Sequence, residues 1–107
     1  MLTRILHVTD DPTVSITVRV FAPVQDGRDW SCAFSINWPD KLTERKILGI
    51  DAIQSLELAL RMIGTELYTS EHHKAGRLVW LQPGDGYGFP VPNTIRDMLV
   101  GEDRNFF

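Results

Sequence analysis

The stretch of this sequence whose residue types come nearest to a chemical site is LQPGDGYGFPVP, residues 81–92. Three glycines alternate with Asp85 and Tyr87, and Phe89 follows the last of them. Glycine-rich loops can bind phosphate because their backbone amides face the anion. A phosphate-binding P-loop, however, needs a Lys followed by Ser or Thr, and this stretch contains neither type of pair.

The glycine spacing in this stretch also differs from that of a dinucleotide-binding fingerprint, which is G-x-G-x-x-G at the start of a helix. Pro90 and Pro92 disfavour the helical conformation in the residues before them, so no helix can begin directly at the glycines. We therefore interpret the stretch as a wide turn at the exit of a strand. The functional hypothesis is that Asp85, Tyr87 and Phe89 contact a ligand or a partner.

Other residues with chemical potential favour structural roles. His72 and His73 are adjacent, whereas zinc-binding pairs usually have wider spacing, so we expect a solvated connection and no metal site. Cys32 falls on an apolar strand face, where a free cysteine behaves as a small hydrophobic residue. Asp10 and Asp11 lie in the turn-like segment TDDPT. We predict no catalytic residue and no cofactor.

The composition is that of one globular domain spanning residues 1–107. Hydrophobic residues make up 43% and charged residues 23% of the chain, which is typical of a protein with a packed core. A formal net charge of -3 argues against nucleic-acid binding, which needs clustered Lys and Arg. The sequence has no apolar run long enough to cross a membrane and no signal peptide, so we expect a cytoplasmic protein without membrane attachment.

Two segments alternate apolar and other residues with the period of a half-buried strand. They are 15–22 and 30–38, and the turn signal Asp26-Gly27 between them predicts an antiparallel hairpin. Weaker patterns predict strands at 3–8 and 44–50, which completes a meander of four strands. The second segment turns small, nearly uncharged residues outward, a surface suited to solvent or to a partner: Ser31, Ala33, Ser35 and Asn37.

The period then changes to that of a helix over residues 52–68. Asp51 is a good N-cap, and Gln54 stands where a capping box places Glu or Gln. The expected buried stripe is Ile53, Leu56, Leu60, Ile63 and Leu67. A short strand at 77–82 and a short helix at 93–101 follow. The predicted class is α+β, with an antiparallel sheet of four to five strands, the long amphipathic helix on one face, and the order ββββαβ plus a C-terminal helix.

One part of the chain resembles a family of small uncharacterised bacterial proteins. The shared features are a G-x-D-x-x-Q helix start in GIDAIQ, an apolar helix, a strand, and a Gly/Pro loop that ends in G-F-P. The resemblance covers Gly49 to Pro92. It implies a bacterial α+β domain and carries no known catalytic residues.

Two functions remain open. The first is a non-enzymatic protein-interaction module of a bacterial cytoplasmic protein, of the immunity or accessory type by analogy of size, with homodimer formation as a related prediction. The alternative is a small-molecule-binding domain or small enzyme with a pocket near residues 83–92. A hydrogen bond from Asp85 or Tyr87 to a histidine inside a closed pocket would favour the enzyme.

Overall fold

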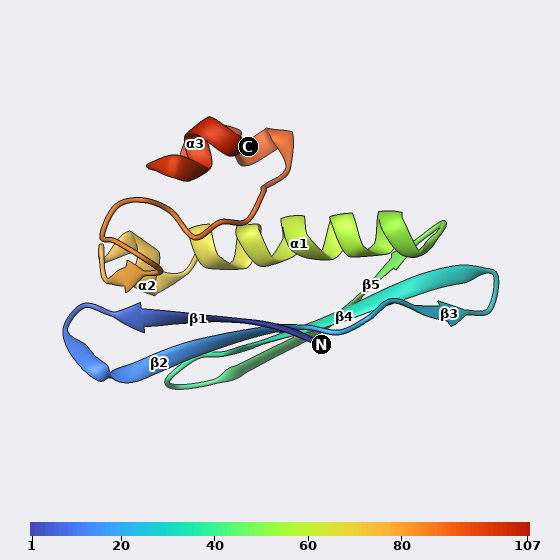
Figure 1. The fold of residues 1–107 in the computed structure, drawn as a ribbon, viewed down its shortest axis with the longest axis horizontal. Helices are drawn as coiled ribbons and strands as arrows, with labels where there is room; N and C mark the ends of the chain where they lie inside the picture. The colour runs from blue at the N-terminus through green and yellow to red at the C-terminus, as the bar shows by residue number, and fades with distance from the viewer.

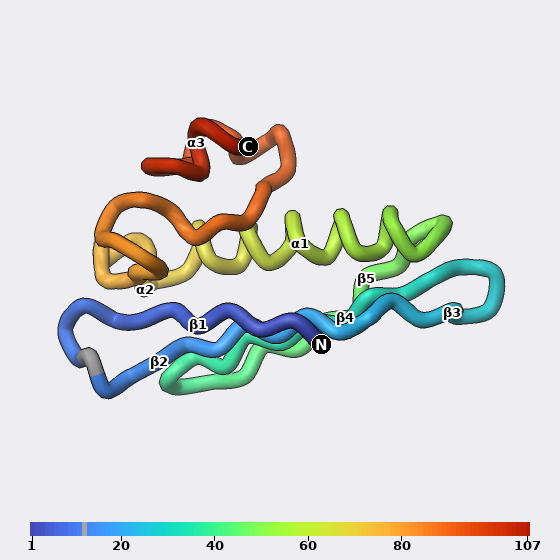
Figure 2. The backbone as a smooth tube through the Cα atoms, in the orientation of Figure 1, coloured from blue at the N-terminus to red at the C-terminus, as the bar shows by residue number. Residues whose placement is uncertain are grey.

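The structure, a computed structural model, describes residues 1–11 and 13–107 (Figures 1 and 2). Within these residues six strands form one antiparallel sheet: β1 (Leu2–Val8), β2 (Asp11–Val20), β3 (Val24–Asp26), β4 (Asp29–Asn37), β5 (Leu42–Gly49) and β6 (Leu78–Val79). β4 pairs with β5 along one edge and with β2 and β3 along the other. β1 then pairs with β2, and β6 adds to β1.

The alternation that predicted the two main strands sets the register of the sheet. Val18 lies opposite Ile36 and Val20 opposite Phe34, and all four side chains are buried on the inner face. The predicted Asp-Gly turn belongs to a shorter hairpin, between β3 and β4. Its Gly27 has φ +64°, which the first position of a type II′ turn requires. β3 was not predicted, because Pro23 precedes it and two of its three residues, Gln25 and Asp26, are polar.

The long helix α1 (Ala52–Tyr68) packs on the inner face of the sheet and begins as predicted (Figure 1). The carboxylate of Asp51 accepts a hydrogen bond from the backbone N of Gln54 at 2.8 Å, and Gln54 Oε1 accepts one from the backbone N of Ile50 at 2.7 Å. The described helices include none that is both long and apolar enough to cross a bilayer.

The predicted buried stripe of α1 is wrong at its N-terminal end, where Ile53 is 76% exposed. The physical reason is the close approach of the helix to Gly49: a Cβ on that residue would lie 2.4 Å from the backbone N of Ser55. The first turn therefore meets the sheet through Ser55 and its backbone. The residues that α1 buries are Ser55, Ala59, Ile63, Gly64, Leu67 and Tyr68.

After β6, residues 80–107 form a third layer, which lies on the side of α1 facing away from the sheet (Figure 1). A Cβ on Gly64 of α1 would lie 2.0 Å from the carbonyl oxygen of Pro90, so the two segments are in direct backbone contact. The layer contains two short helices: η1 (Asn93–Met98), which is a 3-10 helix, and α3 (Glu102–Phe106). A further short helix, α2 (Glu71–Lys74), lies between α1 and β6 in the chain. We name residues 80–92 the glycine loop.

Three predictions for the chain after α1 need correction. The expected strand at 77–82 is reduced to β6, Leu78–Val79, and α2 stands where a polar connection was expected. The helix expected at 93–101 is the shorter 3-10 helix η1, which ends at Met98 because Leu99 is extended at φ -60° and ψ 141°. The helix α3 lies beyond the expected range and begins after Gly101, which has φ +56°. The α+β class, with a helix packed on an antiparallel sheet and a short C-terminal helix, is confirmed.

Candidate functional site

A buried carboxylate joins three segments at the top of the molecule. Asp103 of α3 is 3% exposed, and its Oδ2 accepts hydrogen bonds from Tyr68 Oη at 2.6 Å and from the backbone N of Tyr87 at 2.8 Å. Its Oδ1 accepts a third, from the backbone N of Gly88 at 2.8 Å. Hydrogen bonds to an ionised acceptor are roughly twice as strong as neutral ones. Asp103 therefore holds α3 against both α1 and the glycine loop.

Two glycines of the loop permit this close packing. Gly86 and Gly88 have φ +85° and +76°, which L side chains rarely adopt. A Cβ on Gly86 would lie 2.5 Å from Cγ of Asp103, and one on Gly88 would lie 2.5 Å from Cζ3 of Trp80. The glycine spacing that first suggested a phosphate loop is explained by backbone conformation and by contact with these two side chains.

Arg4 of β1 holds the same loop from the sheet side. Its Nη1 donates hydrogen bonds to the carbonyl oxygens of Tyr87 at 3.1 Å and Gly88 at 2.9 Å. The guanidinium lies 4.0 Å from the ring centroid of Trp80 and 4.7 Å from that of Phe89, a cation–π arrangement with both rings. Burial lowers the pKa of Arg4, and the nearby Asp103 carboxylate opposes that effect. The loop is thus fixed at its amides by Asp103 and at its carbonyls by Arg4.

A tyrosine–histidine pair lies beneath the loop. The hydroxyl of Tyr87 is hydrogen-bonded to Nδ1 of His73 in α2, and the His73 ring meets the Tyr68 ring edge-on at a centroid distance of 4.9 Å. Burial raises the pKa of both tyrosines, with a further contribution from Asp103, and lowers that of His73. Both shifts favour the uncharged forms, so the hydrogen bond joins a protonated tyrosine hydroxyl and a neutral imidazole. Because Tyr87 is only 4% exposed, the hydrogen bond lies in the core and gives a substrate no direct access.

Outside this core the glycine loop and α3 form the two walls of a cleft of about 350 Å³. Apolar side chains from both walls line most of it: Trp80 and Leu81 on one side, Phe106 and Phe107 on the other. Leu81 and Phe106 are 72% and 75% exposed. Asp85 and Glu102 also line the cleft. We call this cavity the α3 cleft. It can take an apolar group, with carboxylates beside it.

The three residues predicted from the sequence lie near the α3 cleft but in different positions. Asp85 is half-buried and lines the cleft. Tyr87 and Phe89 are buried and support the loop from within, where one meets His73 and the other meets Arg4. Both side chains thus pack into the core, and Asp85 is the one of the three that lines the cleft.

Sequence reasoning missed the four residues that hold the site together: Arg4, Tyr68, His73 and Asp103. The hydrogen bonds of Arg4 and Asp103 join residues 83 and 35 positions apart, so no local spacing reveals them. The two histidines were expected to be solvated, and both are instead half-buried: the His72 ring stacks on Trp38 at 5.4 Å. Cys32 is fully buried, as expected. The described residues contain no group of three or more His, Cys, Asp or Glu that could hold a metal ion.

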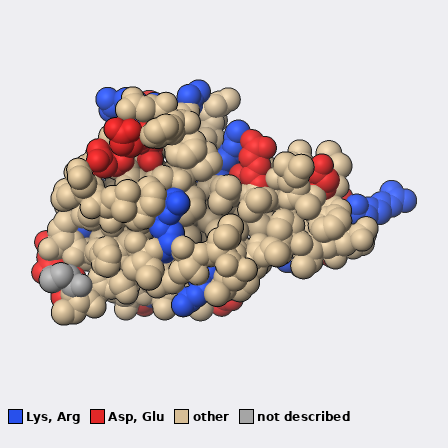
Figure 3. All heavy atoms as spheres, in the orientation of Figure 1, with Lys and Arg blue, Asp and Glu red and all other residues tan. Residues whose placement is uncertain are grey.

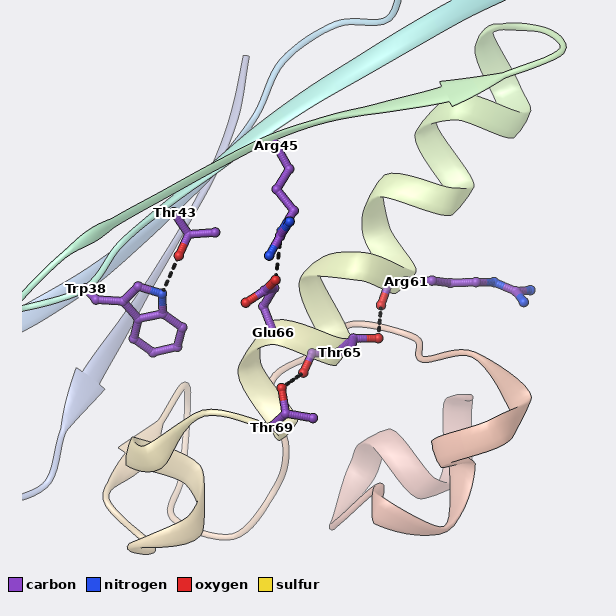
Figure 4. Close-up of polar contacts among 7 residues, drawn as sticks. All are labelled: Trp38, Thr43, Arg45, Arg61, Thr65, Glu66 and Thr69. Atoms are coloured by element: carbon purple, nitrogen blue, oxygen red, sulfur yellow. Dashed lines mark hydrogen bonds and ion pairs between the residues drawn. The ribbon is translucent and has the colours of Figure 1, made fainter.

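A second hollow, of about 210 Å³, lies beside Trp38 at the C-terminal end of α1. Glu66 of α1 lines this hollow, and it points toward Arg45 of β5, with which it forms an ion pair at 2.8 Å (Figure 4). Trp38 Nε1 donates to Thr43 Oγ1 at 3.1 Å, and Thr69 Oγ1 donates to the carbonyl oxygen of Thr65 at 2.6 Å. Of these three contacts, the Arg45–Glu66 ion pair joins α1 to the sheet.

Comparison with known proteins identifies the family of the chain. No curated protein and no solved structure matches it significantly. One family model matches residues 2–91, which include the sheet, α1, Arg4 and nearly all of the glycine loop, and end before α3. This match confirms membership of an uncharacterised family, as the resemblance of residues 49–92 implied. The chain belongs to the family described as Domain of unknown function (DUF6968).

Proposed function

We propose that this chain is a non-enzymatic protein-interaction module whose contact surface is the α3 cleft. The observation that carries the proposal is the exposure of Leu81 and Phe106 on opposite walls of an apolar cavity. Apolar side chains held open to water in this way are typical of surfaces that another protein covers. The proposed setting is a bacterial cytoplasm, with an accessory or immunity-type role suggested by analogy of size.

The rigidity of the walls supports this proposal. Asp103 bonds α3 to the glycine loop, and Arg4 bonds the loop to β1. A preformed cleft binds more tightly because its walls lose little conformational freedom on binding. The hydrogen bond between Tyr87 and His73 is half-buried behind the loop, and neither the Tyr87 hydroxyl nor His73 is among the residues that line the cleft.

Co-purification from cells that carry the native gene tests the proposal. A tagged chain with Leu81→Ser and Phe106→Ser is compared with the unchanged chain and with a control that carries Ile50→Ser and Ile53→Ser. The control side chains, just before and within the first turn of α1, are 78% and 76% exposed, so their exposure is similar to that of Leu81 and Phe106. We expect a partner protein that the control retains and the cleft variant loses. Equal partner sets for all three chains contradict the proposal.

The alternative is a small-molecule-binding domain that uses the same cleft. Its supporting observation is the volume of about 350 Å³, which lies at the lower end of the range for ligand pockets. Native mass spectrometry of the chain purified from its own cells separates the two functions. A bound small molecule that disappears in the Leu81→Ser and Phe106→Ser variant supports this alternative.

A further inference from the structure

We infer that the α3 cleft recognises a segment of a partner protein in which an apolar or aromatic side chain stands beside a Lys or Arg. The inference rests on the proposed function and names the chemistry of its partner. It follows from two properties of the cleft walls, namely their apolar lining and the sign of the charge placed next to it.

The apolar part of the site is large enough for a whole side chain. Trp80 and Leu81 face Phe106 and Phe107 across about 350 Å³. An apolar cavity of about 150 Å³ already holds a benzene molecule, so the cleft has room for a phenyl ring or a leucine side chain with part of its backbone. The exposed side chains of Leu81 and Phe106 extend the apolar surface beyond the cavity, toward the rest of such a segment.

The charged part of the site consists of two carboxylates that the backbone brings together. The backbone N of Glu102 donates to the carbonyl oxygen of Asp85 at 3.1 Å. Gly101 makes this contact possible, because a Cβ there would lie 2.3 Å from Cα of Asp85. Asp85 and Glu102 therefore stand on adjoining parts of the two walls, and acidic atoms gather beside α3 in Figure 3.

Within the described residues, neither Asp85 nor Glu102 forms an ion pair with a Lys or Arg of the chain. Arg4 donates to the carbonyl oxygens of Tyr87 and Gly88 and lies over two rings, and Arg104 Nη2 donates to the carbonyl oxygen of Leu99 at 3.5 Å. Asp103 is satisfied by Tyr68 and by the loop amides. The carboxylates of Asp85 and Glu102 are thus the charged groups that a bound segment would meet. They favour a segment in which a positively charged Lys or Arg follows the apolar residue that enters the cleft.

Titration of the isotopically labelled chain with three synthetic hexapeptides, observed by two-dimensional NMR, tests the inference. The peptides share one neutral frame and carry Phe-Arg, Phe-Glu or Ser-Arg at their centre. We expect Phe-Arg to shift the amide signals of Trp80, Asp85 and Glu102, and to bind about fivefold more tightly than Phe-Glu. Ser-Arg, which lacks the apolar group, is expected to bind more weakly than Phe-Arg.

Two variants, each with two carboxylates replaced by amides, test whether the preference for Phe-Arg over Phe-Glu arises at the cleft. In Asp85→Asn with Glu102→Gln the two phenylalanine peptides should bind equally. The control, Asp40→Asn with Glu71→Gln, makes the same change at the second hollow and should keep the wild-type ratio. Equal binding of Phe-Arg and Phe-Glu to the wild-type chain, shifts that map away from the cleft, or no binding of any peptide overturns the inference. The proposed function fails separately, through equal partner sets in co-purification.

Discussion

At the scale of single residues, the geometry of the candidate site depends on one buried charge. Asp103 receives hydrogen bonds from a side chain of α1 and from two amides of the glycine loop. Each donor would be left without its partner in the core if the carboxylate were removed, and unsatisfied buried groups are costly. The same residue belongs to α3, which forms one wall of the cleft, so cleft shape and stability are coupled through it.

Replacing Asp103 by Asn should lower the free energy of unfolding by about 1.5–3 kcal/mol, the range for a hydrogen bond to a charged group. The amide keeps the shape of the side chain but presents an NH₂ group to backbone N–H donors. Urea denaturation measures the loss. The matched variant Asp97→Asn, at an exposed position of η1, should stay close to wild type. Equal denaturation midpoints for the two variants would show that the Asp103 network contributes little.

Stability should fall on both sides of neutral pH. Burial lowers the pKa of His73 from its usual 6.5, so below about pH 6.5 the unfolded chain binds this proton more readily than the folded chain and the free energy of unfolding decreases. Burial raises the pKa of Tyr68 and Tyr87 from the usual 10.0, so above about pH 10 the unfolded chain loses phenolic protons first and stability falls again.

Urea midpoints measured across this pH range check the prediction for the histidine. His73→Gln should flatten the decline between about pH 7 and 5, the range in which histidine changes charge. His7→Gln, on the exposed side of β1, should retain the decline because His73 is intact. The prediction is wrong if His73→Gln and wild type decline in parallel.

At the scale of elements, α1 is packed between the sheet and the C-terminal layer. The sequence pattern predicted the helix bounds and its N-cap well, since both depend on neighbouring residues. It placed the buried stripe incorrectly at Ile53, because the rotation of the helix is set by contact with Gly49 on β5 and with Pro90 in the third layer. Hydrophobic periodicity indicates that a helix has an apolar face. Which residues of that face are buried depends on the rotation of the helix, which close backbone contacts with distant segments determine.

This rotation predicts a large difference between two helix positions. Leu67→Ala should cost about 2–5 kcal/mol, because the side chain is fully buried and its loss leaves a cavity. Ile53→Ala should change the free energy of unfolding by no more than about 0.5 kcal/mol, as surface substitutions usually do. Urea denaturation of both variants decides the matter. An equal loss in the free energy of unfolding for the two variants would show that Ile53 is buried, as the sequence pattern predicted.

At the scale of the whole molecule, the third layer is where sequence and structure differ most. The strands of the sheet were predictable because strict alternation over β2 and β4 is a local signal. The C-terminal segment has little regular structure, and its position depends on Arg4, Tyr68 and Asp103, whose contacts span most of the chain. The glycine loop was recognised as unusual, but its neighbours could not be inferred from spacing.

Self-association stays a prediction at this scale. The outer face of the sheet exposes Ile5, Leu42 and Leu48, with charged residues between them. Sedimentation equilibrium across micromolar concentrations measures it directly. A weight-average mass that rises above that of one chain supports a homodimer, and replacing Leu42 and Leu48 by Lys should then reduce the rise. A constant single-chain mass removes the homodimer.

Site-specific photo-cross-linking in cells that carry the native gene tests the central claim most directly, because it records contact at the α3 cleft itself. A photoreactive amino acid is placed at Leu81 in one chain and at Ile53 in another, two positions of nearly equal exposure at 72% and 76%. We predict a cross-linked protein partner from position 81 that is absent from position 53 and is lost when Phe106→Ser is added. Identical cross-linking patterns from both positions would contradict the assignment of the α3 cleft as the contact surface.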